Sequence, residues 1–348
     1  MLLLMAYFLI STAGCQKDQG LIADFTTKSN PEKPNLVKLE NHSKGDFNEV
    51  YWKFRNQSLT DTTDFEAYFP FEGTYTIRLI VANENQKDTL IKTIKIAEGD
   101  PEYLKKFRLV WEDNFNGNKL NNDYWTYATG DHGWGNQELQ NYTDGKNAEI
   151  TDGKLVIHIR KENDKKVPGS YTSSRINTKG KKGFKHGQVE VRAKLPAGKG
   201  VWAAIWMLGN NIDEVGWPAC GEIDIMEYVG FSPDTVHSTV HTPAGFAGNG
   251  DGNHMQLNTC EETFHTYGLI WTPEKMIFYV DEPEKVVHEY APTPKNIKNW
   301  PYTNPAYLII NTAIGGTWGG LHGVDNTIFP QKMEIDHVKV YQSPLTIN

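Results

Sequence analysis

Cysteine is scarce in this sequence, with only Cys15, Cys220 and Cys260 among 348 residues. Cys220 and Cys260 could pair in an oxidising compartment or remain as two small buried hydrophobic residues, and the sequence leaves both outcomes open. None of the three lies in a cluster of cysteine and histidine with the spacing of zinc ligands. The scarcity therefore argues against a zinc or other transition-metal site.

Positive charge is also in deficit, because 35 Lys and Arg face 43 Asp and Glu, for a formal net charge of -8. Nucleic acids and highly sulfated glycans are polyanions, and the proteins that bind them usually present a basic surface. We therefore expect neither as a ligand.

The apolar stretch at the N-terminus, Leu2 to Ile10, is too short to span a membrane, which takes about 20 residues. Small residues follow it, so we predict a bacterial lipoprotein signal at residues 1–14, lipidation of Cys15 and a tether at 15–19. The protein is then exported to the cell envelope, on the outer membrane or cell surface, and touches the membrane only through its lipid anchor. Thr12 and the missing basic residue before the apolar stretch depart from the usual pattern. The alternative is an ordinary secretory signal with a coincidental cysteine.

Long amphipathic helices are absent as well. Short runs of alternating apolar and polar residues, separated by Gly, Pro, Asn and Asp, occur instead, for example at 154–159, 188–193, 276–280 and 307–310. Many short strands at close spacing favour an all-β sandwich or jelly roll over an α/β fold. A length of 348 residues exceeds one small domain, and 39% hydrophobic residues suffice for a proper core.

Aromatic residues, by contrast, are abundant: 10 Trp, 16 Tyr and 15 Phe. Some of them fill cores, but flat apolar faces with polar edges also stack against sugar rings. The composition therefore suits a carbohydrate ligand.

Residues 20–97 form the first predicted domain. Its strand-like segments include 49–54, 73–81 and 89–96, and their pattern resembles a PKD-like immunoglobulin sandwich with Trp52 in its core. Such a module is either a rigid spacer, the simpler interpretation, or a glycan-binding unit. The polar segment 98–106 is the predicted linker to a second domain at 107–345.

The most informative segment is 221–228, which reads Gly-Glu-Ile-Asp-Ile-Met-Glu-Tyr. In a regular strand Glu222 and Asp224 face one side and Glu227 faces the other. A single β-bulge near Ile225 and Met226 adds one residue and returns Glu227 to the face of the other acids. We therefore predict a bulged strand with three carboxylates along one groove. The alternative is a strand whose acids merely face water.

Paired carboxyl groups in a groove are typical of enzymes that hydrolyse glycosidic bonds. Retaining glycosidases place two of them about 5 to 5.5 Å apart, one as nucleophile and one as general acid and then base. An aspartate between them can hydrogen-bond the nucleophile and help the acid to keep its proton. The spacing of Glu222, Asp224 and Glu227 permits this arrangement.

The segment 217–230 resembles the active-site strand of family 16 glycoside hydrolases, specifically the laminarinase-like β-glucanases with the bulged form of the motif. Further segments resemble the family in the same order: 109–115, 133–140, 174–176, 187–208 and 335–341. The resemblance covers roughly residues 104–345. It implies a β-jelly roll of two stacked antiparallel sheets with a substrate cleft on the concave face.

The resemblance also implies residue roles: Glu222 matches the nucleophile, Glu227 the acid/base and Asp224 the residue between them. The candidate substrate contacts are Asn136, Arg175, Trp202, Trp206, Trp217, His241 and Trp318. Asn136 and Arg175 match positions that hydrogen-bond sugar hydroxyls, and Trp202, Trp206 and Trp217 match tryptophans of the cleft. Trp318 lies in a glycine-rich run where an exposed aromatic residue has no obvious core to fill, which suits a wall of the cleft. Each of the three matched tryptophans could instead pack in a core, above all Trp206 in its apolar run. A histidine at the position of His241 often faces the cleft in laminarinase-like members, although a lone histidine is more often structural.

No catalytic cofactor is expected. The resemblance implies a structural calcium ion on the convex face, held by an aspartate of the last strand and two main-chain carbonyls. Asp336 matches the aspartate, and Asn114 and Gly153 match the carbonyl positions. A ligand set made only of oxygen suits calcium.

Together the matches imply a monomeric, endo-acting, retaining β-glucanase that hydrolyses β-1,3-glucan of the laminarin type through a covalent glycosyl-enzyme. Mixed-linkage β-1,3/1,4-glucan is an open second substrate. Two alternatives also stay open: a galactan hydrolase of the agarase or carrageenase type in the same family, and a non-catalytic glycan-binding surface lipoprotein.

Overall fold

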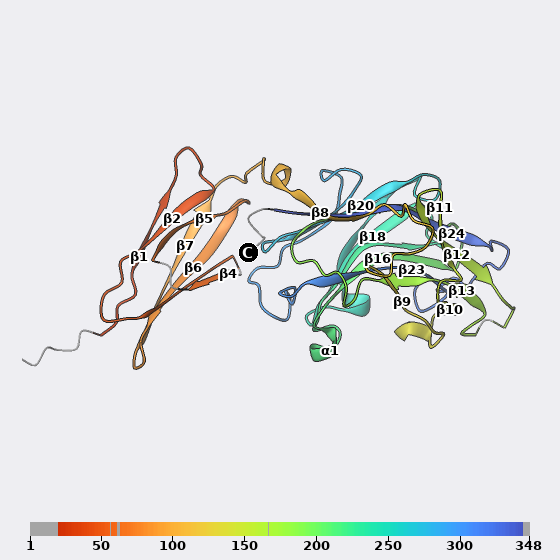
Figure 1. Ribbon diagram of the computed structural model, residues 1–348, viewed down its shortest axis with the longest axis horizontal. Helices are drawn as coiled ribbons and strands as arrows, with labels where there is room; N and C mark the ends of the chain where they lie inside the picture. Colours follow the sequence, from red (N-terminus) through yellow and green to blue (C-terminus); the bar gives the residue numbers. More distant parts are fainter. Residues whose placement is uncertain (1–19, 56, 61–62, 166, 344–348) are drawn as a thin grey trace, which may run out of the picture. The chain divides into compact units, whose positions relative to one another are not determined.

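The computed structural model of this protein describes residues 20–55, 57–60, 63–165 and 167–343. The chain divides after Tyr103 into two compact units, drawn red to orange and yellow to blue in Figure 1. The predicted linker, 98–106, spans this division, where the chain forms the 3-10 helix η1 (Leu104–Lys106). The predicted signal and tether, including Cys15, lie outside the described residues. No helix in the described part of the chain is long and apolar enough to cross a membrane.

The N-terminal unit is a sandwich of two antiparallel sheets, ordered β1-β2-β5 and β4-β3-β6-β7. The strands are β1 (Phe25–Ser29), β2 (Leu36–Asn41), β3 (Glu49–Phe54), β4 (Gln57–Thr60), β5 (Asp64–Tyr68), β6 (Gly73–Ala82) and β7 (Lys87–Ile96). Apolar residues of both sheets share one core, in which Trp52 is fully buried. This arrangement is consistent with the predicted immunoglobulin-like sandwich, and the finer PKD-like assignment stays a prediction.

The C-terminal unit is a larger sandwich, whose ten-stranded sheet follows the order β10-β13-β12-β24-β15-β20-β21-β22, with β11 beside β12 and β8 beside β24. These strands are β8 (Arg108–Asp113), β10 (Gln140–Tyr142), β11 (Ala148–Thr151), β12 (Lys154–Lys161), β13 (Tyr171–Ser173), β15 (Gly187–Lys194), β20 (His265–Trp271), β21 (Met276–Val280), β22 (Val286–Tyr290) and β24 (Gln331–Gln342). The pair β10 and β13 is parallel.

The second sheet of this unit has seven strands in the order β19-β18-β17-β16-β23-β14-β9. They are β9 (Thr126–Tyr127), β14 (Arg175–Asn177), β16 (Val201–Gly209), β17 (Glu222–Val229), β18 (Thr235–His241), β19 (Asp251–Gln256) and β23 (Ala306–Ile314). Three short helices lie in the connections: η2 (Gly133–Gly135), α1 (Ile212–Val215) and η3 (Ala247–Asn249).

A single apolar core joins the two sheets of the C-terminal unit. Leu155 and Val191 of the ten-stranded sheet and Ile205 and Ile310 of the seven-stranded sheet are fully buried in it. The alternation of β15, in which every second residue is buried, shows how one strand covers the core with one face and meets solvent with the other. The predicted all-β jelly-roll class is confirmed, and the four runs chosen from the sequence lie within β12, β15, β21 and β23.

The two cysteines of this unit are not paired with each other. Cys220 and Cys260 are both free and buried, and burial raises the pKa of the Cys220 thiol to about 11. The sequence leaves open a disulfide or two small buried hydrophobic residues, and the structure shows the second outcome.

Candidate active site

The strand β17 carries the predicted bulge. Asp224 pairs with Thr239 but Glu227 pairs with His237, so three steps along β17 match two steps along β18. The extra residue lets Ile225 and Met226 both enter the core, and the hydroxyl of Ser238 donates to the carbonyl oxygen of Ile225 at 2.8 Å. All three acids therefore share the face of the sheet that points away from the core, as predicted.

Each of the two outer glutamates is held by an indole N–H. Trp217 Nε1 donates to Glu222 Oε2 at 2.6 Å, and Trp202 Nε1 donates to Glu227 Oε1 at 3.0 Å. Just before Glu222, Gly221 has a φ of +77°, and a Cβ there would lie 2.7 Å from the ring of Tyr302. A glycine at 221 thus lets the chain enter β17 against that ring.

The middle acid, Asp224, contacts a histidine. His241 Nε2 lies 3.2 Å from Asp224 Oδ2 and 4.0 Å from Glu222 Oε1. One ligand atom from each of the three residues falls within 4.8 Å of the others, a spacing at which a metal ion could also bind. The predicted cleft position of His241 is therefore the one that the structure has.

Burial raises the pKa of all three carboxyl groups. Desolvation and then the charge of Asp224 raise the pKa of Glu222 to about 8, while His241 acts to lower it. Desolvation raises the pKa of Glu227 to about 7 against the hydrogen bond from Trp202. The pKa of Asp224 is raised well above its ordinary value, by burial first and by the charge of Glu227 second. The cluster therefore retains protons near neutral pH, as a general acid must.

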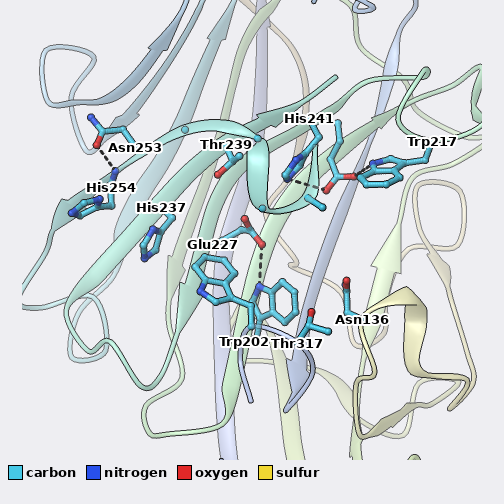
Figure 2. Close-up of a pocket in the computed structure, with 16 residues that line it drawn as sticks. Asn136, Trp202, Trp217, Glu227, His237, Thr239, His241, Asn253, His254 and Thr317 are labelled. Carbon is cyan, nitrogen blue, oxygen red and sulfur yellow. Dashed lines mark hydrogen bonds and ion pairs between the residues drawn. The ribbon is translucent and has the colours of Figure 1, made fainter. Parts of the chain in front are cut away.

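The acids lie between two adjoining cavities of about 580 and 430 Å³. Both cavities are lined by Asn136, Trp202, Trp217, Glu222, Glu227 and Ala247, so they form one continuous cleft. Figure 2 shows Glu227 in the middle of the first cavity, His237 and His254 toward one end, and Trp217 and Asn136 toward the other. The cleft has room for sugar residues on both sides of the acids.

All seven predicted substrate contacts line this cleft. Arg175 lies between two indoles, with its guanidinium carbon 4.7 Å from the ring centroids of Trp134 and Trp206. Trp206 borders the cavity, and its Nε1 donates to Asn311 Oδ1 at 2.7 Å. Trp318 makes an edge contact with Trp202, their ring centroids being 5.5 Å apart.

Several lining residues were missed in the sequence: Trp134, Glu138, His237, Thr239, Asn253, His254 and Thr317. Two of them could have been predicted from period-two alternation, because His237 and Thr239 precede His241 at steps of two along β18, while Val236 and Val240 face the core. Phe246 was missed too. Its ring contacts that of Trp217 edge-on, with centroids 5.4 Å apart, and both side chains are 44% exposed.

The three predicted calcium positions come to the same level of the ten-stranded sheet. Leu155, two residues after Gly153, pairs with Ile335, and Asp113, just before Asn114, pairs with Val338. Asp336 lies between those two partners. However, Asp336 Oδ2 already accepts from Arg192 Nη1 at 3.1 Å and lies 3.0 Å from His337 Nδ1. The other carboxylate oxygen of Asp336 and the main-chain oxygens at Asn114 and Gly153 are donors of the kind that calcium prefers.

Comparison with known proteins agrees with the bulged strand and its three carboxyl groups in an open cleft. Residues 135–339, more than half of the chain, match the family described as Glycosyl hydrolases family 16. The chain belongs to this family.

The known proteins that are similar to this chain include glucanases and a laminarinase. The chain is 42% identical over 247 residues to the "Beta-glucanase" of Rhodothermus marinus, which covers 68% of this chain and 85% of that protein. It is 38% identical over 271 residues to "Glucan endo-1,3-beta-glucosidase A1" of Niallia circulans, covering 72% of this chain and 40% of that one. The solved laminarinase of Flavobacterium sp. UMI-01 superimposes with a TM-score of 0.63 at 48% identity, over 68% of this chain and all of the other. The protein is therefore a glycoside hydrolase.

Proposed function

We propose that this protein is an endo-acting, retaining β-glucanase that hydrolyses β-1,3-glucan of the laminarin type. The observation that carries the proposal is the pair Glu222 and Glu227, each oriented by one indole N–H on the floor of a cleft that continues past both of them. The substrates named for the three relatives support glucan as the polymer.

The proposed reaction has two steps. The ionised carboxylate of Glu222 attacks the anomeric carbon while protonated Glu227 gives its proton to the leaving oxygen, so the glycosidic bond breaks and a glycosyl ester forms. Glu227, now ionised, then takes a proton from water, whose oxygen displaces Glu222. Burial raises the pKa of both Glu222 and Glu227, so the two pKa values do not tell the nucleophile from the acid. We assign the two roles from the match to the family motif.

Endo action is supported by the shape of the cleft. A chain cut in its interior needs sugar-binding room on both sides of the acids, and cavities of about 430 and 580 Å³ adjoin there. Indole walls such as Trp202, Trp206 and Trp318 suit the faces of sugar rings. The deficit of positive charge suits a neutral polymer.

Product analysis on laminarin, barley β-glucan, lichenan and agarose tests this function. We expect laminarin to be cut fastest, into oligosaccharides of several sizes from the earliest times, since endo cleavage releases internal fragments. Activity on the mixed-linkage glucans would extend the range without changing the class. Cleavage of agarose alone would replace the glucanase with the galactan hydrolase.

We also propose that a calcium ion binds Asp336 together with the main chain at Asn114 and Gly153. The β12–β24 and β8–β24 registers support the proposal by bringing these positions together. The ion would stabilise the sheet, because it would cross-link three segments that are distant in sequence. It would take no part in bond cleavage, since these positions lie on the sheet opposite the one that holds the acids.

Removal of calcium is expected to lower the melting temperature by about 5 to 10 °C, because an ion that binds only the folded state contributes about 2.7 kcal/mol at a hundred times its Kd. The initial rate of laminarin hydrolysis at low temperature should change little. Thermal unfolding with and without chelator is the measurement, and Asp336→Asn is the control that should no longer respond. Identical wild-type melting curves would remove the metal assignment.

A further inference from the structure

Glu138 is a buried carboxylate of the cleft that the proposed reaction does not use. It lies between η2 and β10, is 4% exposed, and borders the smaller cavity. Burial raises its pKa, while hydrogen bonds from Gln140 and Asn136 and the charge of Arg175 act in the opposite direction. Because its neighbours are hydrogen-bond donors, this buried carboxylate acts as an acceptor.

Three side chains meet the Glu138 carboxylate. Asn136 Nδ2 donates to Oε1 at 3.2 Å, Gln140 Nε2 donates to Oε2 at 2.6 Å, and the hydroxyl of Tyr142 contacts Oε2 at 3.4 Å. The two oxygens thus have different partners. One faces Asn136, and the other faces the interior of the unit.

The partners on the interior side have no freedom to change roles. Gln140 Oε1 accepts the main-chain N–H of Ile314 at 2.7 Å, which leaves Nε2 to face Glu138. The Tyr142 hydroxyl accepts from Asn311 Nδ2 at 2.9 Å, and Asn311 Oδ1 in turn accepts the indole N–H of Trp206. Main-chain and indole N–H groups can only donate, so both series of hydrogen bonds run toward Oε2 of Glu138.

Asn136 differs from Gln140 and Tyr142, because its hydrogen bond to Glu138 is what sets the orientation of its side-chain amide. With Nδ2 turned to Glu138, the amide oxygen of Asn136 is the atom left for the cleft, and Asn136 lines both cavities. Figure 2 shows the Asn136 side chain at the end of the cavity that lies away from His254. The sugar group that meets it must therefore be a hydroxyl that donates.

We propose that Glu138 is a positioning residue that fixes the Asn136 amide with its oxygen toward the cleft, and so makes this position an acceptor for a substrate hydroxyl. The inference rests on the proposed function, since it concerns how the same cleft binds the hydroxyl groups of its glucan. It assigns no part in bond cleavage to Glu138.

The test is Glu138→Gln, which keeps the size of the side chain. Because Gln140 and Tyr142 both donate at the inner position, the new amide must put its oxygen there and its NH2 group toward Asn136. Asn136 then has to turn over and present its own NH2 group to the cleft. The sugar hydroxyl that donates to the amide oxygen in the wild type has to accept from that group instead, and its own proton loses this acceptor. We expect KM for laminarin to rise about tenfold or more, with kcat within about threefold of wild type.

A second substitution separates positioning from simple damage. In Glu138→Gln combined with Asn136→Asp, the new aspartate accepts from the new glutamine and still offers an oxygen to the cleft, so KM should return to within about threefold of wild type. Asn136→Asp alone places two carboxylates against each other and should be impaired. Additive defects in the double variant would overturn the proposal, as would an unchanged KM in Glu138→Gln.

Glu190→Gln is the matched control. Glu190, on β15 of the opposite sheet, also accepts from a glutamine and a tyrosine, Gln188 Nε2 and the Tyr279 hydroxyl, both at 2.8 Å. Its KM should equal that of wild type. If Glu138→Gln does not fold, a double variant that folds and has a KM near that of wild type still supports the proposal. A double variant that folds but keeps a high KM contradicts it. A wild-type protein inactive on laminarin would instead refute the proposed function.

Discussion

Replacement of Glu222 by Gln is expected to leave a folded protein that binds laminarin but turns it over several orders of magnitude more slowly. The amide cannot form the glycosyl ester, while its size and its contact with Trp217 Nε1 can be kept through the amide oxygen. Single-turnover rates and binding by calorimetry measure the two effects separately. Hydrolysis at a near-normal rate would show that another group is the nucleophile.

The same variant should be more stable than wild type at alkaline pH. The pKa of Glu222 is raised from its ordinary 4.5 to about 8, mainly by burial. Between these pH values the folded chain binds a proton that the unfolded chain has lost, so the stability of the wild type falls as pH rises through this window. Glutamine does not titrate. The free energy of unfolding of Glu222→Gln, relative to that of wild type, should therefore change little at pH 4 to 5 and rise toward pH 8. The rise should be on the order of a few kcal/mol, at about 1.4 kcal/mol per pKa unit.

Thermal unfolding of the two proteins from pH 5 to pH 8 measures this difference. Glu190→Gln is the control, because its carboxylate lies on the other sheet, away from the acid cluster. A difference in melting temperature that stays constant with pH would mean that Glu222 is ionised in the folded protein throughout this range.

The bulge of β17 could be predicted from sequence because a one-residue insertion is the only simple way to put Glu222, Asp224 and Glu227 on one face while their apolar neighbours enter the core. Strand alternation is a local property, so residues 221–228 alone are enough to predict the face that the acids share. The same rule, applied to β18, would have given His237 and Thr239.

The role of Glu138 could not be predicted in this way. Its donors Gln140 and Tyr142 are close in sequence, but the direction of their hydrogen bonds is set by Ile314 and Asn311, which lie 174 and 169 residues further along the chain. The contact of Trp217 with Phe246 likewise joins two separate loops. Nor does the sequence reveal that Arg192 shares the Asp336 carboxylate, because β15 and β24 become neighbours only in the folded sheet.

Removal of the acid/base should separate the chemistry of the two glutamates. In Glu227→Ala no group protonates the leaving oxygen, so glucan should be cut very slowly. An aryl glycoside with an activated leaving group needs little such help, and its first step should still proceed through Glu222. The protein should then accumulate as a glycosyl ester, because no general base remains to draw a proton from water. Mass spectrometry of the intact chain would detect this ester.

Added azide should restore turnover of the aryl glycoside by Glu227→Ala, because an anion needs no base to attack the ester. Two inversions at the anomeric carbon, one by Glu222 and one by azide, give a β-glycosyl azide from a β-glycoside. Glu222→Ala with azide is the matched experiment, and there a single displacement gives the α-azide. If Glu227→Ala yields the α-azide, the roles of the two glutamates are reversed. Trp202, which donates to Glu227, would then orient the nucleophile, and Trp217, which donates to Glu222, would orient the acid.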